Sequence, residues 1–242
     1  MVGIRRAFAL LLLGFYVTQF AMTAFLGPDE LYAAYLGLAL CYTLAFVGVA
    51  AEWFWARWFA IGVGNFGSLL ILVLFQVGME PIIAFFGFTH LAVSVFLSGE
   101  GMAARYEYSE EAAERWNLQE ESLTLMRRAV KSAGSTIPIL ILYTLGPSPE
   151  FMHWVALGLG GAGLIGLLRG RTWGVLALGS AGAIAACEFF LGDPSAGYLI
   201  LSPFGYPMVS GTVVNLLAAG LLIVPAFFAR PMLRTMRAMR GA

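Results

Sequence analysis

Charged residues are scarce in this chain. Asp, Glu, Lys and Arg make up only 12% of its 242 residues, whereas hydrophobic residues make up 60%. An ordinary soluble domain carries about twice that share of charge. The 14 acidic and 14 basic residues balance to a net charge of zero, so nothing in the charge points to a nucleic-acid partner. We therefore expect a protein whose surroundings are the lipid bilayer.

Residues that build common chemical sites are also few. Cys41 and Cys187 both lie in apolar segments and resemble small core residues more than a disulfide framework. The two histidines, His90 and His153, lie at different depths of their segments, which fits neither a bis-histidine haem nor a zinc site. The sequence contains neither a Gly-x-Ser-x-Gly elbow nor a Walker-type phosphate loop. We expect no cofactor and no metal, and an enzyme acting on lipid is the weakest functional class.

Long apolar runs are what the chain does have. Eight stretches of about 18 or more residues carry almost no charge, and each is long enough to cross a hydrocarbon core of about 30 Å as a helix. The predicted fold class is thus an all-α polytopic membrane protein with eight transmembrane helices. The first run is longer than the apolar part of a signal peptide, so we interpret it as a membrane helix. The predicted spans are 7–26, 31–51, 58–79, 81–99, 129–149, 151–168, 172–191 and 207–229.

Every basic residue falls on one side of this eight-span path. The arginines and the single lysine precede the first span, lie in the loops that follow the second, fourth and sixth spans, or belong to the C-terminal tail. Basic loops stay in the cytoplasm, which predicts that both termini are cytoplasmic. The opposite face carries only acidic residues, in turns rich in Pro and Gly: Asp29, Glu30, Glu80, Glu150 and Asp193. High use of Arg favours a bacterial source, and hence the inner membrane.

The two halves of the sequence share a series of landmarks. Arg-Arg-Ala opens the first and fifth spans at 5–7 and 127–129, and Leu-Gly-Pro ends them at 26–28 and 145–147. The later landmarks recur in the same order. We predict a parallel 4+4 duplication with a pseudo-twofold axis along the membrane normal. The repeats are residues 1–105 and 127–242.

Two segments have no counterpart in the other half. Residues 106–126 carry six glutamates, among them Glu107, and are expected to form a solvated acidic cytosolic linker, with a docking surface as the alternative. Residues 195–206 form an insertion on the outer side, just before the last span. This insertion is apolar and irregular, which suits an interfacial or re-entrant plug, or a plain interfacial loop.

Four polar side chains mark a candidate site inside the predicted membrane. His90 and Asn215 each lie 15 residues before the arginine that ends their span. Gln76 and Glu188 lie five and six residues before the proline at the outer end of theirs. The two pairs match across the halves and share the outer half of the bilayer. Around one central cavity they would form a substrate or proton site.

Two interpretations of these residues stay open. In the first, Glu188 takes up a proton and His90 relays it or binds a ligand. In the second, His90 and Asn215 are hydrogen-bonded glue between helices, at about 0.6 kcal/mol per contact, and Glu188 reaches water.

Acidic residues also lie near arginines at the cytoplasmic ends of the second and fourth spans. Glu52 and Glu100 are close in sequence to Arg57 and Arg105. We predict structural ion pairs among them.

The functional prediction is a permease or channel for a small solute or ion, coupled to protons through the polar site. The alternative is a non-catalytic subunit or scaffold of a larger membrane complex. Its partner would be another membrane protein or a second copy of the chain.

Overall fold

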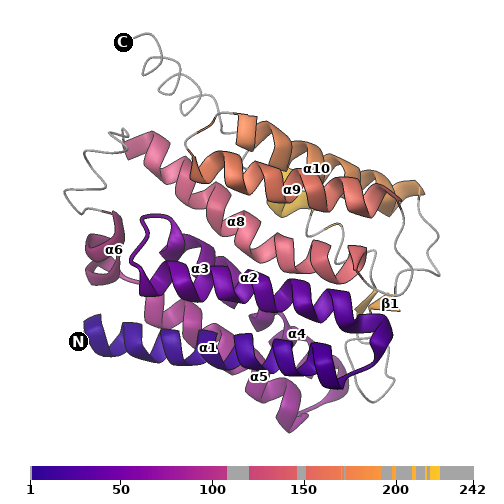
Figure 1. The fold of residues 1–242 in the computed structure, drawn as a ribbon, viewed down its shortest axis with the longest axis horizontal. Coiled ribbons are helices and arrows are strands. Elements are labelled where there is room, and N and C mark those ends of the chain that lie inside the picture. The colour runs from indigo at the N-terminus through magenta and orange to yellow at the C-terminus, as the bar shows by residue number, and fades with distance from the viewer. Residues whose placement is uncertain are drawn as a thin grey trace.

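The described elements are helices, apart from one short pair of strands (Figure 1). The structure is a computed structural model that describes residues 2–107, 120–145, 151–169, 171, 173–191, 198–199, 209–210, 216 and 219–223. The helices are α1 (Val2–Leu26), η1 (Asp29–Leu31), α2 (Tyr32–Ala50), α3 (Ala56–Ser68), α4 (Leu70–Val77), α5 (Pro81–Leu97), α6 (Glu100–Glu107), α8 (Glu120–Thr144), α9 (Phe151–Leu168) and α10 (Trp173–Leu191). The strands β1 (Tyr198–Leu199) and β2 (Val209–Ser210) pair antiparallel.

Helices α3 and α8 form the centre of the bundle. Ten of the 13 residues of α3 are buried, and α3 packs on α8, α5 and α2. Figure 1 shows α8 between α2 and α3 on one side and the pair of α9 and α10 on the other. The two central helices meet at glycines, because a Cβ on Gly62 would lie 2.3 Å from the carbonyl oxygen of Lys131. Small residues thus allow the backbones to touch, as they do between membrane helices.

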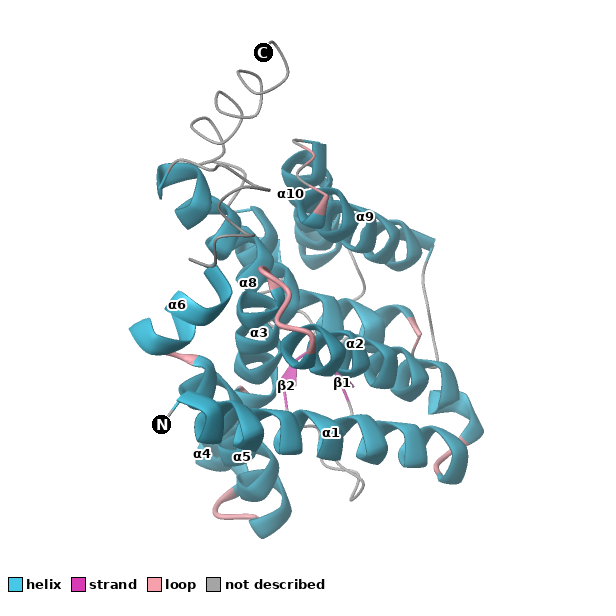
Figure 2. Cartoon of the chain, turned by 60° about the vertical axis from the view of Figure 1, so that its left-hand side comes forward, coloured by secondary structure: helices cyan, strands magenta, loops and turns pink. Residues whose placement is uncertain are grey.

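Glycine also brings α9 against α10. A Cβ on Gly174 would lie 2.5 Å from the carbonyl oxygen of Gly163, and one on Gly166 would lie 3.0 Å from the ring of Trp173. The backbones are too close for larger side chains at these positions. In Figure 2 these two helices lie on the opposite side of α8 from α1 and α5.

The third predicted span, residues 58–79, is two helices rather than one. It begins at Ala56 and breaks at Leu69, between α3 and α4. The break follows Gly67 and Ser68, and the hydroxyl of Ser68 donates to the carbonyl of Asn65 at 2.8 Å. Glycine and serine pairs are common causes of helix kinks.

The fourth predicted span, residues 81–99, also ends in a break. Helix α5 stops at Leu97, and the chain turns at Gly99, whose φ of +96° suits glycine alone. It then enters α6 at an angle of 69° to α5. Because α6 runs to Glu107, it reaches into the segment predicted as the acidic linker, and α8 takes up the last seven residues of that segment, 120–126.

The last predicted span does not begin at residue 207, since Val209–Ser210 form strand β2. Helical residues are described at Leu216 and at 219–223. Most of the predicted insertion 195–206 lies outside the described residues.

Several helices are compatible with a membrane. Within the described residues, three are long and apolar enough to cross one, at Val2–Leu26, Asp29–Ala50 and Phe151–Leu168, and a fourth is added if α5 and α6 count as one broken span. Large apolar side chains cover the outward faces, Phe8 and Leu11 on α1 and Phe85, Phe88 and Val95 on α5 among them. Soluble monomers rarely expose such continuous apolar surface.

Candidate functional site

His90, in the middle of α5, is buried in an aromatic cluster, and only 3% of its surface is exposed. Its Nδ1 lies 2.7 Å from the carbonyl oxygen of Phe86, and its Nε2 lies 2.6 Å from the hydroxyl of Tyr42. A carbonyl only accepts hydrogen bonds, so Nδ1 carries the proton. In the neutral ring Nε2 then accepts from the Tyr42 hydroxyl, and both ring nitrogens are satisfied.

The space around His90 is closed. The ring of Tyr16 lies 3.8 Å from the imidazole, centroid to centroid, and its hydroxyl bonds Thr89 at 2.5 Å. On the other side, a Cβ on Gly67 would lie 2.0 Å from Cδ2 of His90. The imidazole therefore fills the gap that a glycine leaves in α3.

Helices α3 and α4 run antiparallel to α5 in a register that three glycine contacts define. Gly64 lies against Ser94, Gly67 against His90, and Gly87 against Ile71. Gln76 follows Gly67 by nine residues, roughly 13 Å along a helix axis. The structure does not bring Gln76 to the level of His90.

The other predicted site residues are placed in part. Gln76 lies in α4 and Glu188 in α10, but their side chains are outside the described part of the chain. Asn215 lies outside the described residues altogether. The polar residues that the structure does gather around α5 are Asn65, whose Oδ1 accepts from Ser94 at 2.9 Å, and Thr89.

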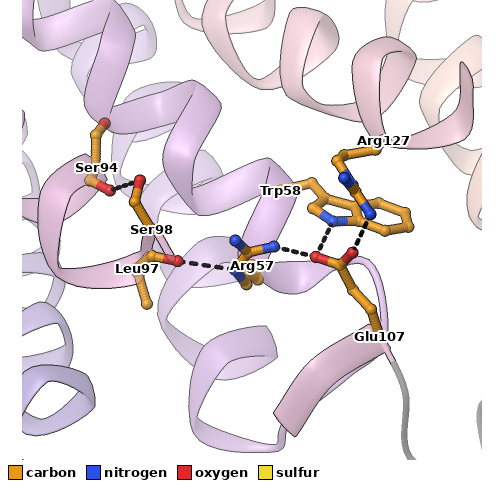
Figure 3. Close-up of polar contacts among 7 residues, drawn as sticks. All are labelled: Arg57, Trp58, Ser94, Leu97, Ser98, Glu107 and Arg127. Carbon is orange, nitrogen blue, oxygen red and sulfur yellow. Dashed lines mark hydrogen bonds and ion pairs between the residues drawn. The ribbon is translucent and has the colours of Figure 1, made fainter. Parts of the chain in front are cut away.

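A buried carboxylate at one end of the bundle was missed by the sequence prediction. Glu107, predicted to be solvated, is fully buried at the end of α6. It binds the guanidinium of Arg57, accepts from Nε1 of Trp58 at 2.7 Å, and binds Arg127 at 2.5 Å. Figure 3 shows the carboxylate between the two arginines. It thereby ties α6 to both α3 and α8.

A local signal for this burial exists in the sequence. Met102 and Tyr106 are buried at i and i+4 on α6, a spacing that predicts a helix face directed at a core. Glu107 adjoins that face. The run of glutamates that follows conceals the pattern.

A second ion-pair cluster joins the ends of α1, α2 and α6. Glu52 binds Arg105 at 2.6 Å and Arg6 at 2.8 Å. Ion pairs do form here, but not between the sequence neighbours: Glu52 pairs with Arg105, and Arg57 pairs with Glu107. Among the ion pairs of the described residues, none involves Glu100. The hydrogen bond from Arg105 holds the pKa of Glu52 below its ordinary value. Burial opposes this shift, and the charges of Arg6 and Arg105 add to the lowering.

Arginines also cap the helix ends in this region. The guanidinium of Arg5 donates to the carbonyls of Val95 and Ser98, at 2.7 and 2.6 Å. Arg57 donates to the carbonyl of Leu97 at 2.8 Å, and Arg6 to that of Ala50 at 2.6 Å. The last carbonyls of α2 and α5 have no partner within their helices, and cations are favourable at this negative end of a helix. Basic residues that are distant in sequence thus meet at one end of the bundle.

The described residues contain no group of three His, Cys, Asp or Glu side chains that could hold a metal ion. Comparison with protein families, curated proteins and solved structures finds no match to this chain.

Proposed function

We propose that this chain is an eight-span inner-membrane protein that acts as a permease or channel for a small solute or ion. Both termini face the cytoplasm, and the 4+4 duplication forms the frame. The gathering of Arg5, Arg6, Arg57, Arg105 and Arg127 at one end supports the orientation, because basic ends belong on the cytoplasmic side.

The observation that carries the site is a helix contact in the second half. A Cβ on Gly182 in α10 would lie within 3.0 Å of Ala219, Leu222 and Ile223. Glu188 follows Gly182 by six residues. Asn215 precedes the middle of the contacting segment 219–223 by about six residues as well. On antiparallel helices, this register supports a placement of Glu188 and Asn215 at the same depth in the membrane.

In this proposal the polar residues of the two halves have different roles. In the first half the residue opposite His90 is Gly67, and the polar group is sealed. We assign His90 and its bond to Tyr42 to holding α5 against α2. In the second half we propose that the carboxyl of Glu188 and the amide of Asn215 form the polar site. Glu188 is the proton-accepting group of the proposed site, with Asn215 as its hydrogen-bond partner and Gln76 outside its immediate shell.

Proton flux into liposomes tests this proposal. The purified protein is reconstituted with a pH-sensitive dye inside, and a potassium diffusion potential drives proton entry. We expect flux above that of empty liposomes, a loss of at least tenfold in Glu188→Gln, and a change of less than twofold in Glu80→Gln. Glu80 is the matched control, because it is an acidic residue in a turn at the outer end.

A second candidate function rests on a separate observation. A Cβ on Gly158 or Gly161 of α9 would meet none of the described residues within 4 Å, and Trp154 and Ile165 beside them are exposed. This open face has room for a helix of a membrane partner or of a second copy. No flux in the wild type, together with a partner that co-purifies in fixed ratio, would replace the permease proposal with a subunit of a complex.

A further inference from the structure

A pocket of about 510 Å³ opens at the arginine-rich end of the bundle. It lies between the start of α3, the turn from α5 into α6, and α8. Its lining consists of Arg57, Gly99, Glu100, Ala103, Ala104 and Arg127. Three of these six side chains are hydrogen or methyl, so among the described residues the lining leaves space beside the two guanidinium groups, whose facing sides the Glu107 carboxylate occupies.

The pocket has more cationic donors than the surrounding carboxylate satisfies. Arg57 and Arg127 share the single carboxylate of Glu107, and the lining also contains the carboxylate of Glu100, so the four charges balance and the case for an anion rests on the hydrogen-bond donors. Each guanidinium has five N–H donors. The Nε of Arg127 is buried and has no hydrogen-bond partner among the described residues, and such a donor is costly unless an acceptor reaches it.

The backbone adds a second favourable field for an anion. Gly99 and Glu100 belong to the turn and the start of α6, whereas the N–H of Ala103 already donates to the carbonyl of Gly99 at 3.0 Å. The N–H groups at the start of a helix lack partners within the helix and carry its positive end. Phosphate groups bind at such ends. The Glu100 side chain is exposed to solvent.

The surface next to the pocket is suited to acyl chains. Gly99 adjoins the guanidinium of Arg5, whose neighbours on α1, Ile4 and Phe8, are exposed. Phe8 stacks on Phe96 of α5 with ring centroids 5.6 Å apart. A phosphate in the pocket would therefore have an apolar surface beside it.

We propose that this pocket binds the phosphate headgroup of an anionic phospholipid of the cytoplasmic leaflet. Arg57 and Arg127 hold the phosphate, and the positive end of α6 adds to their field. Basic pockets on the cytoplasmic side of helical membrane proteins bind anionic headgroups in this way. The inference rests on the proposed orientation of the chain and is independent of the proposed transport.

Lipid titration of the full-length protein in detergent, followed by native mass spectrometry, tests the site. Phosphatidylglycerol is the probe, and phosphatidylcholine is the neutral comparison. We expect Arg127→Gln to weaken phosphatidylglycerol binding at least tenfold. Arg128→Gln is the matched control, since it removes the same charge one residue away, at an exposed position outside the lining, and is expected to change binding less than twofold.

A second variant keeps the test independent of folding. Ala104→Trp fills the pocket but leaves the Arg57, Glu107 and Arg127 contacts in place, and it too should lose the lipid. Equal losses in Arg127→Gln and Arg128→Gln, or full binding in Ala104→Trp, would overturn the proposal. Glycerol 3-phosphate separates the two sources of phosphate: if it displaces the lipid at equal concentration, the assignment to a lipid headgroup is wrong.

Discussion

Replacement of Glu107 by Ala tests whether the buried carboxylate organises the arginine-rich end. The side chain of Glu107 is fully buried and that of Arg57 is 9% exposed, so the variant leaves a buried guanidinium without its partner. Removing one member of a buried ion pair costs about 3–5 kcal/mol. We expect a loss of that size in the free energy of unfolding.

Glu52 provides a control with the same number of arginine partners. It also binds two arginines, but its side chain is 35% exposed. Exposed ion pairs contribute about 0–1 kcal/mol. Glu52→Ala should therefore cost at least about 2 kcal/mol less than Glu107→Ala. Glu107→Gln, which keeps the shape and one acceptor, should fall between them.

The assay is unfolding by SDS in mixed micelles, followed by circular dichroism. Thermal unfolding gives a parallel measurement, in which about 1 kcal/mol corresponds to roughly 2–4 °C for a chain of this size. If Glu107→Ala destabilises the protein no more than Glu52→Ala, burial does not decide the strength of these pairs and the reasoning fails.

Three further predictions use the same unfolding assay. Gly62→Ala should lower the free energy of unfolding by about 1–3 kcal/mol, because its Cβ would meet the backbone of α8. Gly158→Ala, the control, should be neutral or stabilising by up to about 1 kcal/mol. Equal effects of the two variants would contradict the packing of α3 on α8. Gly67→Ala should displace the imidazole of His90 and cost about 1–3 kcal/mol, and adding His90→Ala should restore part of the loss; strict additivity would show that the two do not touch. The lowered pKa of Glu52 means that its ion pairs stabilise the fold above its unfolded pKa of about 4.3, and that this contribution is lost as pH falls through the lower folded pKa. The stability difference between wild type and Glu52→Gln should thus shrink as pH falls from 6 to 3, and a constant difference would exclude that linkage.

Helix positions could be predicted from this sequence, because uncharged length alone specifies where a helix suits a membrane. Helix α9 begins and ends at the predicted residues, and α1, α2, α5 and α10 end within two residues of their predicted C-termini. The breaks at Leu69 and Gly99 could not be predicted in the same way. They depend on local glycine and serine geometry inside otherwise apolar runs.

The candidate site was less accessible to sequence reasoning. The depth of His90 follows from counting residues, but its enclosure by Gly67, Tyr16 and Tyr42 depends on contacts between α5 and three other helices. The sequence prediction put Glu107 in a solvated linker because acidic segments are usually solvated. Its burial depends on the distant Arg57 and Arg127, which no local pattern connects to it.

Cysteine labelling measures the central claim, that eight spans place the arginine-rich end and both termini in the cytoplasm. Single cysteines are introduced as Glu30→Cys, Glu80→Cys, Arg128→Cys and Ala242→Cys in a Cys41→Ala, Cys187→Ala background, and a membrane-impermeant maleimide is applied to intact cells and to opened membranes. The account predicts labelling of the first two in intact cells and of the last two only after opening. Labelling of Arg128→Cys in intact cells, or protection of either Glu30→Cys or Glu80→Cys, would contradict it.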